Sequence, residues 1–236
     1  MKNTAIVLAG GSGSRMKSAV KKQYLLLEGL PVLCYSLSVF QNSPLIDEII
    51  LVCGKGEIEQ CRDEIVKKYG YTKVHHIVEG GKERYHSVYE GLKAAQDCTY
   101  VMIHDGARPF VDQEMLERII NGLPQDRASV VAVPVKDTIK MSDAKGCVAQ
   151  TLPRELLWTV QTPQSFEYSL IRDAYEQLFR TEDENLKITD DAMVAEYFAH
   201  IKVKLIEGSY ENFKITTPED LLLADMILKK RKNSYS

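Results

Sequence analysis

The segment TAIVLAGGSGSRM, residues 4–16, decides the fold of this chain. Residues 4–8 form an apolar run of the length of a buried β-strand, and a glycine-rich turn follows directly. Glycine lets the backbone approach a phosphate group closely and point its N–H groups at it. We therefore expect the first strand of an α/β domain, followed by a phosphate-binding turn that contains Gly10, Gly11 and Gly13.

The turn completes neither of two familiar nucleotide-binding motifs. The dinucleotide pattern G-x-G-x-x-G fits at Gly11 and Gly13 but requires glycine at Met16. The P-loop pattern G-x-x-x-x-G-K-[ST] has its Lys-Ser pair but requires glycine at the same position. What remains is a glycine-rich loop with two nearby cations, Arg15 and Lys22, which suits the phosphates of a nucleotide. A tight turn with basic surface residues explains the same loop.

Outward from this segment, short β-branched runs alternate with amphipathic segments. Strands are expected at residues 4–8, 48–52, 74–78, 100–103 and 129–133. Helices are expected at residues 31–40, 57–68, 83–95 and 113–120. The pattern resumes at residues 166–179, 190–198 and 201–206, and a last helix opens at Thr217-Pro218. This alternation predicts an α/β fold with a doubly wound, mostly parallel sheet covered on both faces, a Rossmann-like arrangement.

The alternation is interrupted between about Pro134 and Pro163. Two short extended pieces, VKDTIKMS and CVAQTL, are joined there by the turn Ser-Asp-Ala-Lys-Gly at residues 142–146. The pattern predicts a β-hairpin arm that protrudes from the sheet. Because a two-stranded arm has too small a core of its own, we expect it to pack on a partner subunit and to form a homodimer. No linker or repeat interrupts the rest, which predicts one domain over residues 1–236.

Composition narrows the class of protein. The chain has 236 residues, of which 44% are hydrophobic and 27% charged, as in ordinary globular domains. Lys and Arg number 30 and Asp and Glu 33, so the net charge is −3, which argues against nucleic-acid binding. Any anion site must be built from local positive charge. Five cysteines without a C-x-x-C pair, and no run of about 18 apolar residues, predict a cytoplasmic protein with no membrane anchor.

Several stretches carry a resemblance to a known family. LAGGSGSRM at 8–16, followed by KKQYL, resembles the signature of nucleotidyltransferases that couple a nucleoside triphosphate to a phosphorylated sugar or polyol. Six more stretches narrow the resemblance to the 2-C-methyl-D-erythritol 4-phosphate cytidylyltransferase family. They are EGGKERYHSV at 79–88, HDGARPF at 104–110, VPVKDTIK at 133–140, LPRELLWTVQTPQSF at 152–166, TDDA at 189–192 and NFKITTPEDL at 212–221.

The resemblance spans residues 5 to about 223 and implies transfer of CMP from CTP to 2-C-methyl-D-erythritol 4-phosphate in non-mevalonate isoprenoid synthesis. Such a reaction joins two polyanions, and the attacking phosphate monoester is already an anion near neutral pH. The protein has to offset charge repulsion and align the reacting groups, so arginine, lysine and Mg²⁺ are expected rather than a nucleophilic side chain.

The resemblance assigns roles to particular residues. The expected catalytic residues are Arg15, Lys22, Arg154 and Lys214. The expected nucleotide-binding residues are Ala9, Gly10, Gly11, Gly13, Arg15, Lys22, Gly81, Ser87 and Asp105. The expected contacts of the polyol phosphate are Asp105, Arg108, Thr138, Arg154, Thr162, Thr189 and Lys214. The family usually has proline where this chain has Lys21, which makes Lys21 a further candidate cation.

Asp105 is the expected ligand of Mg²⁺. It follows an apolar strand directly, at the edge where open α/β sheets bind ligands, and the resemblance places it near the ribose and the metal. On spacing alone, a carboxylate at a strand end is more often a turn former. Without the resemblance, Ser87 would be interpreted as a polar residue of a helix face, and Arg154 and Lys214 as surface residues.

Three other functions compete with this interpretation. A ribitol 5-phosphate cytidylyltransferase of cell-wall polymer synthesis shares the glycine-rich loop, the DGARPF region and QTPQSF, whereas PRELLW and TDDA favour the methylerythritol group. A non-catalytic nucleotide-binding module on the same fold would usually have lost one of the charged site residues, and all of them are present. An NAD-dependent dehydrogenase is disfavoured because the third glycine of its motif is missing.

Overall fold

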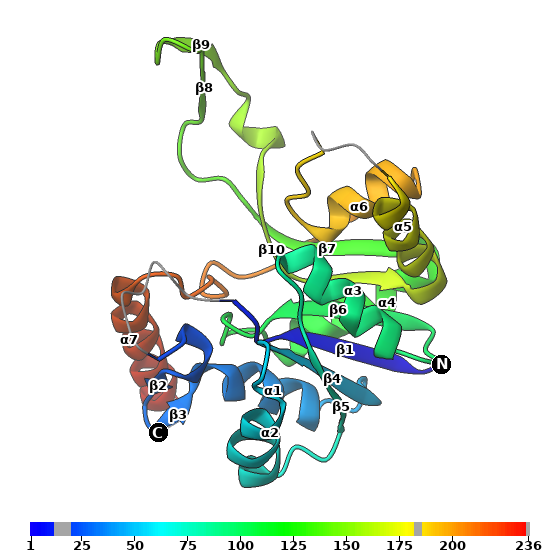
Figure 1. Ribbon diagram of the computed structural model, residues 1–236. Helices are drawn as coiled ribbons and strands as arrows, with labels where there is room; N and C mark the ends of the chain where they lie inside the picture. The colour runs from blue at the N-terminus through cyan, green and yellow to red at the C-terminus, as the bar shows by residue number, and fades with distance from the viewer. Residues whose placement is uncertain (12–19, 182–185, 235–236) are drawn as a thin grey trace.

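A seven-stranded sheet forms the centre of the molecule (Figure 1). The computed structural model describes residues 1–11, 20–181 and 186–234. The strand order is β11-β7-β10-β6-β1-β4-β5, and β10 runs antiparallel to β6 and β7 while the other neighbours are parallel. The strands are β1 (Asn3–Leu8), β4 (Glu48–Cys53), β5 (Val74–Glu79), β6 (Tyr100–Asp105), β7 (Ala128–Pro134), β10 (Trp158–Glu167) and β11 (Lys204–Glu207). The predicted mostly parallel sheet is confirmed.

Helices cover the sheet, as the alternation of the sequence predicts. The helices are α1 (Val32–Asn42), α2 (Ile58–Gln60), its π-helical continuation (Cys61–Lys67), α3 (Arg84–Ala94), α4 (Gln113–Asp126), α5 (Tyr168–Arg180), α6 (Asp191–Phe198) and α7 (Pro218–Ser234). Short 3-10 turns lie at Lys22–Tyr24 and Arg154–Leu156, and β2 (Leu26–Leu27) pairs with β3 (Leu30–Pro31). In the described part of the chain, no helix is both long and apolar enough to cross a membrane.

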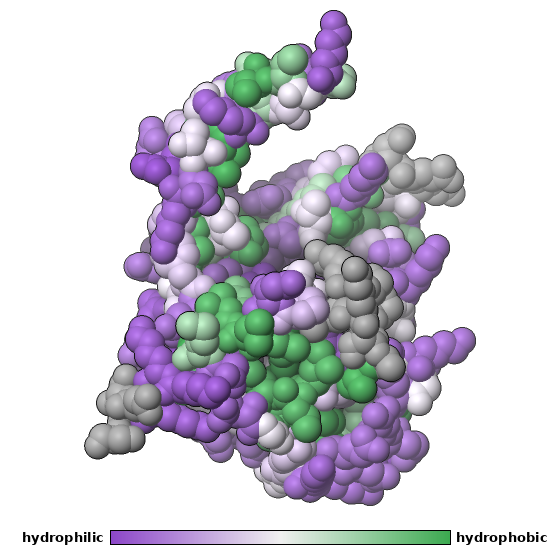
Figure 2. Space-filling view, turned by 90° about the vertical axis from the view of Figure 1, so that its left-hand side faces the viewer, coloured by the Kyte–Doolittle hydropathy of each residue, from purple (hydrophilic) through white to green (hydrophobic). Residues whose placement is uncertain are grey.

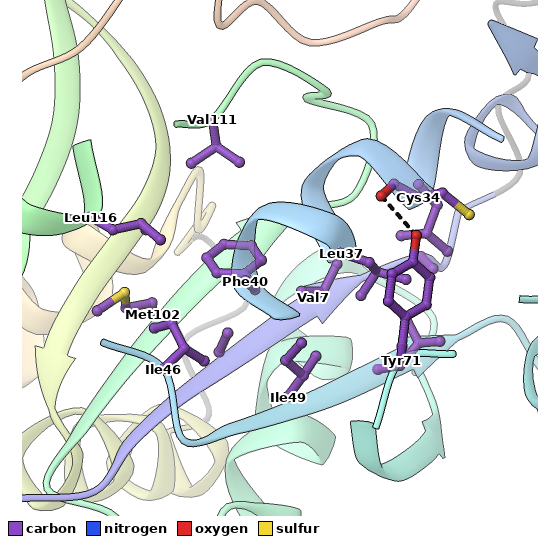
Figure 3. Packing of buried hydrophobic residues seen from close by; sticks show 14 of the residues in the cluster. Val7, Cys34, Leu37, Phe40, Ile46, Ile49, Tyr71, Met102, Val111 and Leu116 are labelled. Atoms are coloured by element: carbon purple, nitrogen blue, oxygen red, sulfur yellow. Dashed lines mark hydrogen bonds between the residues drawn. The ribbon is translucent and has the colours of Figure 1, made fainter. Parts of the chain in front are cut away.

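Two apolar layers lie on opposite faces of the sheet, because successive side chains of a strand point to opposite sides. Val7 of β1 packs with α1 and α4 on one face, and its neighbour Ile6 packs with α3, α5 and α6 on the other. Figure 3 shows the first layer, where Phe40 and Leu37 of α1 lie close to Val7. Buried on both faces, the central strands are apolar throughout, and this is why the sequence reveals them.

The carboxyl ends of β1, β4, β5 and β6 meet at one edge of the sheet. The N–H group of Ala9 donates to the carbonyl of Val52 over 2.7 Å, and the N–H group of Gly106 donates to the carbonyl of Leu8 over 2.9 Å. The N–H group of Gly80 donates to the carbonyl of Cys53 over 2.8 Å. These bonds hold three loops, far apart in sequence, side by side at the edge where open α/β sheets bind ligands.

One central strand escapes the sequence pattern. The sequence suggests an interruption up to about Pro163, but β10 begins at Trp158 and enters the sheet between β6 and β7. Its buried part, from Gln161 to Phe166, is polar at four of six positions, so it shows neither the apolar run nor the alternation of a strand. The polar side chains are hydrogen-bonded inside the protein; Gln161, for example, donates to the carbonyl of Ser209 over 2.8 Å.

The predicted hairpin is present and projects from the sheet (Figure 1). It consists of β8 (Lys140–Ser142) and β9 (Val148–Thr151). In its turn, the side chain of Asp143 accepts hydrogen bonds from the N–H groups of Lys145 and Cys147, each over 2.9 Å. Gly146 adopts φ of +79°, a conformation that favours glycine. Both strands are exposed along their whole length.

Gly91 provides a test of how α3 packs on the sheet. A Cβ atom at Gly91 would lie 2.5 Å from Cγ2 of Ile6, a fully buried, β-branched side chain that cannot move aside. We expect Gly91→Ala to lower the free energy of unfolding by about 1–3 kcal/mol, despite the better helix propensity of alanine. Urea unfolding measures the change.

Gly122 of α4 is the matched control, because a Cβ atom there would meet only the flexible end of Asp126. Gly122→Ala should leave the stability unchanged or raise it by up to about 1 kcal/mol. Equal effects of the two substitutions would contradict the packing argument.

Candidate active site

A pocket of about 280 Å³ opens at the carboxyl edge of the sheet. Seven of its lining residues are among the predicted nucleotide and substrate contacts: Gly10, Gly11, Lys22, Gly81, Ser87, Asp105 and Lys214. The structure therefore brings together residues from five separate segments of the sequence. The other lining residues are Leu8, Gln23, Lys82, Glu83, Arg84, Ala107 and Thr216.

One wall of the pocket is the turn that leads from β5 into α3. The hydroxyl of Ser87 accepts a hydrogen bond from the N–H group of Gly81 over 3.2 Å and donates to the carbonyl of Glu83 over 3.3 Å. A Cβ atom at Gly81 would lie 2.3 Å from Cβ of His86, so the turn can close this tightly only with glycine. Ser87 thus holds the wall in place while its side chain lines the pocket.

Asp105 is the electrostatic centre of the pocket. Its Oδ2 lies 2.8 Å from Nζ of Lys214, its Oδ1 3.1 Å from Nε of Arg84, and Nε of Arg108 is 3.8 Å away. Burial alone would raise the pKa of Asp105, but the charges of Arg84, Lys214 and Arg108 outweigh it and hold the pKa well below its usual range. The carboxylate is ionised and surrounded by three cations.

A chain of hydrogen bonds supports Asp105 from inside the protein. The hydroxyl of Thr162 on β10 accepts from the N–H group of Asp105 over 3.1 Å and contacts Nδ1 of His104 over 3.1 Å. Nε2 of His104 faces the carbonyl of Arg108 at 3.1 Å, so Nε2 carries the proton and Nδ1 accepts from Thr162. Burial lowers the pKa of His104 to about 4, which keeps the ring neutral. Thr162, predicted to contact substrate, is buried and uses its hydroxyl here.

Lys22 and Lys214 lie on opposite segments that meet at the pocket. Nζ of Lys22 donates to the carbonyl of Ile215 over 3.1 Å, next to Lys214 in sequence. The neighbouring Lys21 pairs with Glu57 instead and is not among the lining residues of the pocket. The predicted residues Gly13 and Arg15 lie outside the described residues.

Ala9, which is buried, and Arg108, which is half-buried, support this pocket from behind its lining residues. Ala9 precedes the two lining glycines, and its carbonyl accepts a hydrogen bond from the side-chain amide of Gln23. Arg108 donates from Nη1 to the carbonyl of Asn212 over 2.9 Å, which ties the loop after β6 to the segment that carries Lys214.

Three predicted substrate contacts lie elsewhere in the same chain. Thr138 and Arg154 belong to the segments that lead into and out of the arm, where both are exposed, and Nη1 of Arg154 donates to the carbonyl of Lys136 over 2.7 Å. Thr189 is exposed just before α6, and its hydroxyl contacts the sulfur of Met193 at 3.6 Å. None of the three lines the pocket.

Sequence reasoning assigned no role to Arg84, which lies in the quoted stretch EGGKERYHSV. Its position carried a signal: Arg84 is the first residue of α3, where the helix dipole disfavours a cation. A basic residue at such a position needs carboxylate partners, and Asp105 is one of them. His104 likewise received no role, because only the folded chain brings Thr162 and the Arg108 carbonyl to its two nitrogens.

The residues present fit a divalent cation that one carboxylate and the phosphates of a triphosphate hold together. Among the described residues, no group of three or more His, Cys, Asp or Glu side chains is arranged to hold a metal ion. Asp105 is the carboxylate that lines the pocket beside Lys214, and two cations already share its oxygens. Mg²⁺ often binds through one or two carboxylates together with substrate phosphates and water, which is what this site can offer.

Cations that converge beside an ionised carboxylate suit the handling of phosphate groups, and on this α/β fold they define a nucleotidyltransferase. The family model described as 2-C-methyl-D-erythritol 4-phosphate cytidylyltransferase matches residues 3–230. The chain belongs to this family. This assignment overturns the dehydrogenase and non-catalytic alternatives.

Similar proteins carry the same name. The protein of that name from Clostridium kluyveri is 49% identical over 230 residues, with 98% of each chain covered. The one from Lachnoclostridium phytofermentans is 47% identical over 232 residues, again with 98% of each covered. A crystal structure of 4-diphosphocytidyl-2C-methyl-D-erythritol synthase from Anaerococcus prevotii matches with a TM-score of 0.84 and 37% identity, covering 97% of this chain and 96% of that one.

Thr162→Val tests the support of Asp105. The substitution keeps the shape of the side chain but leaves the N–H group of Asp105 and Nδ1 of His104 without a partner. We expect the free energy of unfolding to fall by about 1–3 kcal/mol, because unsatisfied buried polar groups are costly. Thr162→Ser, which retains the hydroxyl, should lose clearly less in the same urea titration. A valine variant as stable as the serine variant would refute the hydrogen-bond chain.

Proposed function

We propose that this pocket transfers the cytidylyl group of CTP to 2-C-methyl-D-erythritol 4-phosphate, giving 4-diphosphocytidyl-2-C-methyl-D-erythritol and pyrophosphate. The observation that carries the proposal is the convergence of Lys22, Lys214 and Arg84 on one pocket around the ionised Asp105. Family membership supports methylerythritol phosphate over ribitol phosphate as acceptor. Isoprenoid precursor synthesis follows as the role of the product.

In the proposed reaction, a phosphate oxygen of the acceptor attacks the α-phosphorus of CTP. A new P–O bond forms, the bond between the α-phosphorus and the bridging oxygen breaks, and pyrophosphate leaves with the electron pair. Both reactants are anions, so the main barrier is electrostatic and geometric. Lys22, with Arg15, would face the triphosphate, and Lys214 would stabilise charge between the α-phosphate and the acceptor.

The other pocket residues would select the nucleotide. Gly10 and Gly11 offer backbone N–H groups to the phosphates and ribose, on the side of the pocket next to β1. Gly81 and Ser87 form the adjoining wall, since a Cβ atom at Gly10 would lie 3.9 Å from the hydroxyl of Ser87. The tight turn of this wall would limit the space for a base and offer backbone groups to it. The match to the cytidylyltransferase family supports CTP as the donor.

Enzymes of this family use a divalent metal ion, and we propose Mg²⁺, bound through the triphosphate and Asp105. When bound, the ion would neutralise charge on the phosphates. The protein groups that hold Asp105 ready are those already described, namely Arg84, Lys214 and the N–H···Thr162 contact. Lys214 would then leave Oδ2 of Asp105 for a phosphate oxygen as the substrates bind.

We propose that the arm completes the site of a partner subunit in a homodimer. Along the arm, Met141, Val148 and Leu156 expose 48%, 64% and 73% of their surface, more than a stable monomer usually leaves on one projecting element. Figure 2 shows such hydrophobic side chains among charged ones on the arm. Thr138 and Arg154 would reach the acceptor phosphate of the partner, which explains why neither lines the pocket of its own chain.

A cytoplasmic location is proposed as well. All five cysteines are free thiols, and three of them are fully buried. Unpaired cysteines in such numbers are typical of proteins that work in a reducing compartment.

Pyrophosphate release tests the proposed reaction. With CTP and Mg²⁺, we expect release with methylerythritol phosphate and none above background with ribitol 5-phosphate. Lys22→Ala should lower kcat/KM by about 10²–10³-fold, as for the loss of other electrostatic stabilisers. Lys67→Ala makes the same change at an exposed lysine of the π-helical segment, which does not line the pocket, and it should have no effect on kcat/KM. If pyrophosphate is released with ribitol 5-phosphate alone, the acceptor is ribitol phosphate. If it is released with neither acceptor, the proposed reaction is refuted.

Mixed dimers test the role of the arm. If Lys22 and the partner's arm form one site, a heterodimer of Lys22→Ala and Arg154→Ala chains contains one intact site. Random co-assembly of the two inactive chains should therefore restore about a quarter of the wild-type activity. No recovery, with a dimer present by sedimentation, would mean that Arg154 serves the pocket of its own chain. A monomer would refute the dimer itself.

A further inference from the structure

A buried carboxylate outside the pocket is tied directly to it. Asp191, the first residue of α6, is fully buried. Its Oδ1 and Oδ2 accept hydrogen bonds from Nη1 and Nη2 of Arg84 over 2.9 and 2.8 Å. The third edge of the same guanidinium, Nε, donates to Oδ1 of Asp105 over 3.1 Å. One arginine thus bridges two carboxylates, one at the end of β6 and the other at the start of α6.

Asp191 itself is held from two further elements. The hydroxyl of Tyr175 on α5 donates to Oδ1 of Asp191 over 2.6 Å. Burial, and then the charge of Asp191, raise the pKa of Tyr175 well above its usual range, so the hydroxyl remains a donor. The side-chain carbonyl of Gln164 on β10 accepts from the N–H groups of Asp191 and Ala192, each over 2.9 Å. The carboxylate therefore has a single position.

Through the guanidinium of Arg84, the position of the Asp191 carboxylate determines the geometry of groups in the pocket. A bidentate pair fixes both the place and the plane of the arginine, and with them the direction of its Nε–H bond. That bond meets Oδ1 of Asp105 and leaves Oδ2 to Lys214 at 2.8 Å. The rotamer of Asp105, and the place of the Lys214 ammonium beside it, thus depend on a carboxylate that does not line the pocket.

We propose that Asp191 and Tyr175 are positioning residues for cytidylyl transfer, which act through Arg84 on Asp105 and Lys214. The inference rests on the proposed function and adds two residues, on α5 and α6, that touch neither substrate nor metal. The helix dipole at the start of α3 opposes a cation there, so Arg84 needs both carboxylates to stay in place. Removing Asp191 would free the arginine to turn away from Asp105.

Asp191→Asn is the main test, because it keeps the shape and removes the charge. We expect kcat to fall by about 10–100-fold, the size of effect that a small misplacement of catalytic groups produces, while KM for CTP changes little. Tyr175→Phe, which removes one hydroxyl, should lower kcat less, in the same direction. Asp173→Asn is the control, because it makes the same chemical change at an exposed aspartate of α5. It should leave kcat near the wild-type value.

A double-mutant cycle separates positioning from general stability. If Asp191 acts through Arg84, the variant with both Asp191→Asn and Arg84→Gln should be no less active than Arg84→Gln alone. If the effects of the two substitutions on kcat instead multiply, or if Asp173→Asn is as impaired as Asp191→Asn, the inference is wrong. If circular dichroism shows that Asp191→Asn does not fold, the same double-mutant cycle is measured with Tyr175→Phe in its place, and its result decides whether the inference holds. A wild-type protein that releases no pyrophosphate would instead refute the proposed function.

Discussion

The negative charge of Asp105, buried at the end of β6, is the constraint on which the site depends. A buried carboxylate stays ionised only if cations and hydrogen bonds replace the water it has lost. Lys214, Arg84 and Arg108 provide the cations, and they come from three segments that are distant in sequence. Satisfying one charge therefore brings the loop before α7, the start of α3 and the loop after β6 to one place.

The same constraint prepares the site for its chemistry. Catalysis by charge is most effective when the charges are in place before the reaction begins, because no reorganisation is then needed. Here the carboxylate holds Lys214 beside the pocket in the free protein, while Thr162 and the neutral His104 hold Asp105 from behind. Phosphate groups entering the pocket would meet cations that are already oriented. In the proposed reaction, such an arrangement would need no nucleophilic side chain, because the attacking group is a phosphate anion.

The parts of the fold that the sequence predicted are those with strong local patterns. The apolar runs of β1 and β4, the glycines after β1 and the turn at Asp143 each carry their signal within a few residues. β10 was missed because its buried stretch is polar and is satisfied by partners far along the chain. The link between Arg84 and Asp191 was missed for the same reason, since it joins residues 107 positions apart. The motif TDDA points to Thr189, although the charged residue that it buries is Asp191.

By itself, the sequence determined the α/β class, the protruding arm and the family, and it predicted seven of the residues that line the pocket. Periodicity, glycine placement and motif resemblance are properties of residues that are close in sequence, so they can be recognised without knowledge of the fold. Only the tertiary structure decided which charged groups meet: that Lys214 and Arg84 share Asp105, that Lys21 turns to Glu57, and that Thr162 faces His104. Charge pairing acts over a few ångströms in space and leaves no fixed spacing in the chain, so it becomes visible only when the chain is folded.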